Sequence, residues 1–218
     1  MTPGLSALES PMSLIGSTHA LRIPVFAMVL VVLASNILVQ YPFQPFGLSD
    51  TLTWGAFSYP FAFLVTDLTN RRFGSATTRK IVYAGFIVAV IFSALLATPR
   101  IAIASGLAFL LAQLIDVAIF NRLRRMAWWA PPFASSVVSS AIDTAVFFTV
   151  AFSCAPAING TLALLGVQNA CGDGLPWRNW ALYDYYVKLA LAAIFILPYG
   201  GLLRRLAPPP ESNLSARR

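Results

Sequence analysis

The sequence of 218 residues is 58% hydrophobic and only 11% charged. Soluble domains carry about 25% charged residues, so this composition excludes an ordinary soluble domain and indicates a membrane protein with several spans. The net charge of +7 does not indicate a nucleic-acid-binding protein, because the basic residues gather at the ends of apolar segments.

Six segments are long and apolar enough to span a bilayer, which requires about 20 residues of helix. They comprise residues 23–40, 54–70, 81–98, 101–120, 133–153 and 183–203. Most connections between them are short, which favours tightly packed neighbours. We therefore predict an all-α integral membrane protein, with six transmembrane helices in a compact bundle.

We divide the chain into three parts. Residues 22–206 are expected to form the membrane domain with its six helices. Residues 1–21 are expected to be a short cytoplasmic segment without a cleaved signal, and residues 207–218, with three prolines, a disordered cytoplasmic tail.

The basic residues predict the orientation, since they favour the cytoplasmic side of a membrane. One side of the predicted bundle would hold Arg22, Arg71, Arg72, Arg79, Lys80, Arg122, Arg124, Arg125, Arg204, Arg205, Arg217 and Arg218, and the opposite side only Arg100 and Arg178. Both termini should therefore face the cytoplasm. The long connection 154–182 would then lie outside, where its two cysteines could form a disulfide or remain free.

The segment 53–74 combines aromatic side chains, a proline and polar residues. Pro60 lacks an N–H group and is expected to break the helix. Asp67 and Asn70 are three residues apart and share a helical face. An ionisable group within a bilayer is costly, so Asp67 indicates a functional site. The alternative is an interfacial cap or a partner for Arg71.

Three other predicted helices carry polar residues at helical spacing. They are Asn36 and Gln40 on the first, Gln113 and Asp116 on the fourth, and Ser136, Ser139, Ser140 and Asp143 on the fifth. Because lipid cannot satisfy their hydrogen bonds, these faces should point inward and enclose one polar cavity. Alternatively, such groups bond between helices for stability alone.

Lys188 is the only basic residue within a predicted span. It could pair with Asp184, four residues earlier and near the outer surface. Alternatively it could neutralise Asp143 or Asp116 inside the bundle, which would lower the cost of burying either carboxylate.

Carboxylates and amides beside aromatic rings suit a flat heteroaromatic ligand with several N–H groups. A carboxylate can accept the ring N–H and exocyclic amine of a guanine-like base, while Trp54, Phe57 or Tyr59 stacks on its face. Each of these rings could instead pack or lie in an interfacial belt. No metal site or cofactor is expected, since His19 stands alone and the cysteines lack further ligands.

Long motifs support a closer identification. They are TWGAFSYPFAFLVTDLTNRRFG (53–74), LAQLIDVAIFNRLRR (111–125), WWAPPFAS (128–135), and DYYVK and ILPYGGLL within 184–203. In these motifs the chain resembles the bacterial queuosine precursor transporters of the vitamin uptake transporter family. The resemblance implies a stand-alone, non-enzymatic carrier in the bacterial inner membrane. Its substrate would be a 7-deazaguanine base, 7-cyano-7-deazaguanine (preQ0) or its aminomethyl analogue, which are precursors of a modified tRNA base.

Together, the chemistry and the resemblance define a predicted substrate site. Its residues are Asp67, Asn70, Gln113 and Asp116 for the base edge, Asp143 or Lys188 to complete the site, and Asn36, Trp54, Phe57, Tyr59 and Ser140 as further lining. The expected partners are the substrate and membrane lipid, with no nucleic acid, and a homodimer is left open. Pro60 and Pro198 are expected to be break points for alternating access. One buried carboxylate could carry a coupling proton, or transport could need no coupling.

Two other classes of function remain open at this point. The chain could be the substrate-binding subunit of a multi-component vitamin importer. It could also be an intramembrane aspartyl hydrolase, although Tyr183-Asp184 lies at the edge of a span and Gly172-Asp173 lies in a connection.

Overall fold

The computed structural model describes residues 11–167, 171–172 and 174–206 of the chain, and the side chains within 21–203 of these ranges. The predictions for residues 1–10 and 207–218 lie outside the described residues. Throughout the described part the regular secondary structure is helical, with one isolated β-bridge between Pro42 and Thr53. The predicted all-α class is therefore confirmed.

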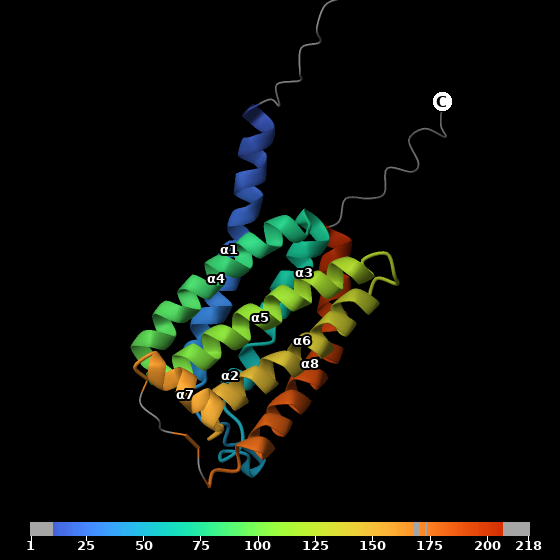
Figure 1. Cartoon of the computed structure of the whole chain (residues 1–218). Helices are drawn as coiled ribbons and strands as arrows, with labels where there is room; N and C mark the ends of the chain where they lie inside the picture. Colours follow the sequence, from blue (N-terminus) through green and yellow to red (C-terminus); the bar gives the residue numbers. More distant parts are fainter. Residues whose placement is uncertain (1–10, 168–170, 173, 207–218) are drawn as a thin grey trace, which may run out of the picture.

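The helices run back and forth across the molecule (Figure 1). They are α1 (Pro11–Leu38), the 3₁₀-helix η1 (Pro45–Gly47), α2 (Gly55–Ser58), α3 (Phe61–Phe73), α4 (Ser75–Leu96), α5 (Pro99–Leu123), α6 (Ala130–Phe152), α7 (Pro156–Leu164) and α8 (Trp177–Leu206). Among the described residues, five of these are long and apolar enough to cross a membrane: α1, α4, α5, α6 and α8.

The second predicted span is not one continuous helix. It consists of α2 and α3, which meet at Tyr59 and Pro60. Pro60 has no N–H to donate, and the N–H of Ala62 bonds the carbonyl of Tyr59 at 2.9 Å in a tighter turn. The break predicted at Pro60 is thus confirmed. The break predicted at Pro198 is wrong, because α8 continues through that residue.

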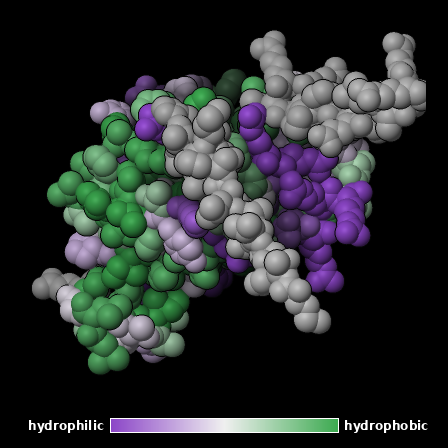
Figure 2. All heavy atoms as spheres, turned by 90° about the horizontal axis from the view of Figure 1, so that it is seen from above, coloured by the Kyte–Doolittle hydropathy of each residue, from purple (hydrophilic) through white to green (hydrophobic). Residues whose placement is uncertain are grey.

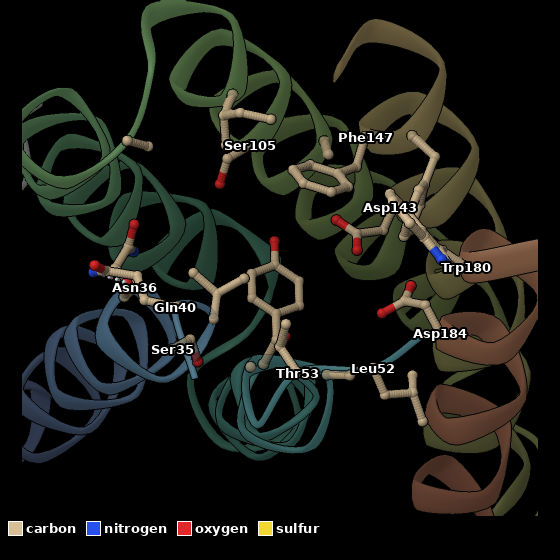
Figure 3. A pocket seen from close by; sticks show the side chains of 18 of the residues that line it. Ser35, Asn36, Gln40, Leu52, Thr53, Ser105, Asp143, Phe147, Trp180 and Asp184 are labelled. Carbon is tan, nitrogen blue, oxygen red and sulfur yellow. Dashed lines mark hydrogen bonds between the residues drawn. The ribbon is translucent and has the colours of Figure 1, made fainter. Parts of the chain in front are cut away.

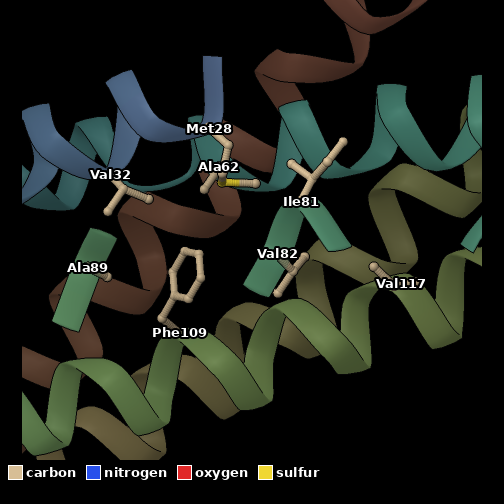
Figure 4. Close-up of a cluster of buried hydrophobic side chains, with 8 residues drawn as sticks. All are labelled: Met28, Val32, Ala62, Ile81, Val82, Ala89, Phe109 and Val117. Atoms are coloured by element: carbon tan, nitrogen blue, oxygen red, sulfur yellow. The ribbon is translucent and has the colours of Figure 1, made fainter. Parts of the chain in front are cut away.

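Helix α5 is the centre of the bundle. It packs most extensively against α6 and α4, while α6 also contacts α8 and α4 contacts α1. Buried apolar side chains from α1, α3, α4 and α5 meet in one cluster (Figure 4), comprising Met28, Val32, Ala62, Ile81, Val82, Ala89, Phe109 and Val117. The outer faces of α1 and α8 carry exposed apolar side chains such as Ile23 and Leu197, as lipid-facing surfaces do.

The basic residues collect at one end of the bundle. The end of α3, the start of α4 and the end of α5 meet there, because successive helices run in opposite directions. The view of this end in Figure 2 shows a concentrated hydrophilic region beside hydrophobic surface. Arg72, Arg79, Lys80, Arg122 and Arg125 are exposed at this end.

The opposite end is held by two cross-links. Cys154 and Cys171 form a disulfide, with their Cα atoms 5.1 Å apart, which resolves the alternatives left open by the sequence. Arg100, at the start of α5, is 4% exposed. Its guanidinium donates to the carbonyls of Val150 at 2.9 Å and Ser153 at 2.6 Å, near the end of α6, and to the side chain of Asn159 at 2.9 Å. These bonds satisfy carbonyls that a helix end leaves without partners.

Gly55 marks the closest approach between α2 and the chain after α1. A Cβ atom added at Gly55 would lie 2.8 Å from the Cα of Val39, which cannot move aside as a flexible side chain would. We expect Gly55→Ala to destabilise the protein by about 1–3 kcal/mol, the range for overpacking. The measurement is the thermal unfolding midpoint of the purified protein in detergent.

Gly160→Ala is the matched control, because an added Cβ at Gly160 in α7 meets nothing within 4 Å. Equal midpoints for the two variants would contradict the close packing of α2 against Val39.

Candidate functional site

A cavity of about 490 Å³ opens among α1, α2, α5, α6, α8 and the connection 39–54 (Figure 3). It lies toward the end of the bundle opposite the basic residues, since its lining includes the start of α5, the end of α6 and the start of α8. Its polar lining includes Ser35, Asn36, Gln40, Asp50, Ser105, Asp143, Asp184 and Lys188, and its aromatic lining Tyr59, Phe147, Phe148, Phe152 and Trp180. Pockets of about 300–1,000 Å³ bind small molecules.

A buried ion cluster forms one wall of this cavity. Lys188 Nζ donates to Asp143 Oδ2 at 2.7 Å, to Asp184 Oδ2 at 2.5 Å and to Thr144 Oγ1 at 3.1 Å. Thr144 in turn donates to Asp184 at 2.7 Å. Lys188 therefore pairs with both Asp184 and Asp143, which the sequence analysis left as alternatives, whereas Asp116 is not a partner of Lys188. Two carboxyl groups share one ammonium in this wall.

The predicted aromatic residues divide between two places. Tyr59 lines the cavity, and the ammonium of Lys188 lies 5.7 Å from the centre of its ring. Trp54 and Phe57 instead pack against Phe43, with ring centres 4.8 and 4.6 Å away. In this structure Trp54 and Phe57 therefore pack within the protein and are not placed to stack on a bound base.

Asn36 lines the cavity but also bonds within the bundle. Its amide donates to the carbonyl of Val32 at 2.9 Å and accepts from Ser93 on α4 at 2.7 Å. Gln40, two residues after the end of α1, donates to the carbonyl of Asn36. Ser140 is buried on α6 outside the cavity lining.

The remaining predicted site residues form a separate group, which we call the inner polar cluster. It comprises Thr66, Asp67 and Asn70 of α3, Gln113 and Asp116 of α5, and Ser135 and Ser139 of α6. Each of these side chains is at most 2% exposed, and none lines the cavity. The polar faces thus point inward as predicted, but they do not enclose one common cavity.

Hydrogen bonds between helices connect the inner polar cluster. Ser135 donates to Asp67 at 3.4 Å, and Ser139 donates to Asp116 at 3.5 Å. Thr66 donates to Oε1 of Gln113. The guanidinium of Arg71 bonds the carbonyl of Arg124 rather than Asp67, so the predicted alternative of an Asp67–Arg71 pair is not formed.

Three polar atoms of the cluster have no hydrogen-bond partner within the described part of the chain. They are Oδ1 of Asn70, Nε2 of Gln113 and Oδ2 of Asp116. A buried polar group left unpaired costs about 1–3 kcal/mol. Such groups therefore require an explanation other than stability.

Sequence reasoning missed several of the residues that complete these two groups. Ser135 lies one turn before Ser139, so extending the polar face of α6 by four residues would have found it. Thr144 and Phe147 adjoin Asp143 along α6. Phe147 lines the cavity, and Thr144 bonds Lys188 and Asp184 only because α6 packs against α8. Thr66 gave no signal, since a threonine hydroxyl often lies against a carbonyl of its own helix, and the hydroxyl of Thr66 is 2.9 Å from the carbonyl of Ala62.

The described fold and cavity define the class: a helical multi-pass membrane protein with a small-solute cavity inside the bundle. A family model described as "Putative vitamin uptake transporter" matches residues 53–98 and 93–202. The chain belongs to this vitamin uptake transporter family. It is accordingly a transporter of the bacterial inner membrane and not an enzyme.

Two curated relatives are named as transporters of a queuosine precursor. The chain is 37% identical over 210 residues to the "Queuosine precursor transporter" of Escherichia coli (strain K12), an alignment that covers 84% of this chain and 88% of the relative. It is 33% identical over 212 residues to the "Probable queuosine precursor transporter" of Haemophilus influenzae, covering 82% of this chain and 83% of that relative. No solved structure matches the chain.

Removal of the Lys188 ammonium would leave the Asp143 carboxylate, 4% exposed, without its cation. We expect Lys188→Met to destabilise the protein by about 3–5 kcal/mol, the cost of breaking a buried pair by removing one partner. The measurement is thermal unfolding in detergent.

Lys80→Met is the control, because Lys80 is exposed at the basic end and surface changes alter stability by about 0.5 kcal/mol or less. If both substitutions had the same small effect, the ion cluster would not support the fold.

Proposed function

We propose that the chain imports a queuosine precursor, 7-cyano-7-deazaguanine (preQ0), and also accepts its aminomethyl analogue. The observation that carries this proposal is the cavity inside the bundle, which combines carboxylates with aromatic walls. The names of the relatives support the choice of substrate. No ATPase partner is required by this proposal, which separates it from the substrate-binding subunit of a multi-component importer.

The cavity offers the groups that a guanine-like base needs. Asp143 and Asp184 provide carboxylate oxygens that accept N–H groups, and Asn36 provides an amide. Tyr59 provides an aromatic face for the flat ring. We assign contact with the entering base to Asn36, Tyr59, Asp143 and Lys188. Trp54, Phe57 and Ser140 support the walls from outside the lining.

We propose six membrane crossings, with α2 and α3 together making the second. The backbone torsions stay helical through the break, with φ/ψ of −59°/−39° at Tyr59 and −60°/−17° at Pro60. At 1.5 Å per residue, the stretch 55–73 would extend roughly 28 Å, close to the hydrocarbon thickness of a bilayer. An even number of crossings puts both termini on one side, and the basic residues favour the cytoplasm. The cavity would then open outward.

This topology predicts opposite accessibility at the two ends. A cysteine in place of Ser49, which lines the cavity and is exposed, should react with a membrane-impermeant maleimide in intact cells. A cysteine in place of Arg79 should react only after the membrane is permeabilised. The native cysteines are paired and leave the background low. The opposite labelling pattern would reverse the proposed orientation.

The transport proposal is tested by uptake of labelled 7-cyano-7-deazaguanine into proteoliposomes that contain only this protein. The native chain should accumulate the base, and Asp143→Asn should reduce the rate about 10-fold or more, because a hydrogen bond to a charged acceptor is lost. Lys188 keeps Asp184 as its partner in this variant.

Thr149→Val, on the same helix but outside the cavity lining, is the control and should transport at the native rate. Lack of uptake by folded native protein would contradict the proposal of a stand-alone carrier for this base.

A further inference from the structure

On each of three helices, a residue of the inner polar cluster lies eight residues from a residue that lines the cavity. Asp67 follows Tyr59 by eight residues on the way into α3, and Asp116 follows Ala108 by eight along α5. Along α6, which runs from the basic end toward the cavity, Ser135 precedes Asp143 by eight residues. At 1.5 Å per residue this places the cluster roughly 12 Å deeper, toward the basic end. A solute that crosses the bundle from the cavity would meet this cluster next.

The unpartnered atoms of the cluster have defined hydrogen-bonding roles. The Nδ2 of Asn70 donates to the carbonyl of Val117 at 3.2 Å, so its unpartnered Oδ1 is an acceptor. The Oε1 of Gln113 accepts from Thr66, so its unpartnered Nε2 is a donor. The carboxyl of Asp116 adjoins that of Asp67, and two adjoining buried carboxyls hold one proton between them. With that proton on Asp67, the unpartnered Oδ2 of Asp116 is a second acceptor. The cluster therefore presents two acceptors and one donor, all from side chains that are fully buried.

This set is complementary to one edge of a guanine-like base. That edge carries two donors, the ring N–H and the exocyclic amine, beside one carbonyl acceptor. We propose that the inner polar cluster is a second base-binding subsite, in which Asn70 accepts the exocyclic amine, Asp116 accepts the ring N–H and Gln113 donates to the carbonyl. This inference rests on the proposed function and specifies where the base edge is read.

The contacts at the basic end close the subsite in this structure. Arg71, one residue after Asn70, donates to the carbonyl of Arg124 at 2.9 Å, and Arg124 donates back to the carbonyl of Arg71. These reciprocal bonds tie the end of α3 to the end of α5. The base would reach the subsite only when α3 and α5 separate around it, after it leaves the cavity.

The test is the preference of transport for the exocyclic amine. Initial uptake into proteoliposomes is measured for 7-cyano-7-deazaguanine and for the analogue that lacks this amine, and the ratio of the two rates is compared between variants. For the native chain we expect a ratio of about 10 or more, because the analogue leaves a buried acceptor unpaired. Asn70→Leu removes the acceptor and should bring the ratio close to 1.

Thr69→Val is the matched control, because Thr69 is the buried neighbour of Asn70 and its hydroxyl donates to the carbonyl of Val65 within α3. Its ratio should equal that of the native chain. If Asn70→Leu transports neither base, Asn70→Ala, which adds no bulk, provides the same comparison.

A ratio within about twofold of native in an active Asn70 variant would overturn the subsite while leaving the proposed function intact. Absence of uptake of either base by the native chain would instead contradict the proposed function itself. A loss of rate with an unchanged ratio would assign Asn70 a structural role, which also overturns the subsite.

Discussion

The structure depends on one constraint: lipid offers no hydrogen-bonding partner to a polar group. Every polar side chain within the bundle must therefore find its partner inside the protein or serve a bound solute. Asp67, Asp116, Asp143 and Lys188 are all at most 5% exposed, whereas the surfaces of the long helices are apolar. Helix packing is arranged around these few polar groups, with α5 at the centre.

The two polar groups satisfy this constraint in different ways. The ion cluster at the cavity wall uses every donor of Lys188, so each N–H of that ammonium has a partner. The inner polar cluster is incomplete, since Asn70, Gln113 and Asp116 each keep an unpartnered atom. A protein that only needed stability would gain from apolar residues at these positions. Retention of unpaired polar atoms is characteristic of sites that bind solutes.

The break between α2 and α3 connects the helical framework to the cavity. Tyr59 stands at the break and lines the cavity. Interrupted helices of this kind are common at the substrate sites of transporters. At the cavity end of the bundle, Arg100 links the start of α5 to the end of α6 and to α7, and the disulfide ties down the chain that follows α6.

The sequence by itself determined the membrane class, the five long helices, the break at Pro60 and the inward direction of the polar faces. Composition and helical periodicity decide these features, because they follow from local chemistry and from the absence of partners in lipid. Only the tertiary structure decided which polar residues lie at the cavity wall and which lie in the inner polar cluster. Asp143 and Lys188 meet across α6 and α8, while Asp67 and Asp116 lie deeper between α3 and α5. The spacing of residues along one helix shows which of them share a face. It does not show at which position along the bundle axis that face meets a polar residue of a neighbouring helix. This position is what separates the cavity from the inner polar cluster.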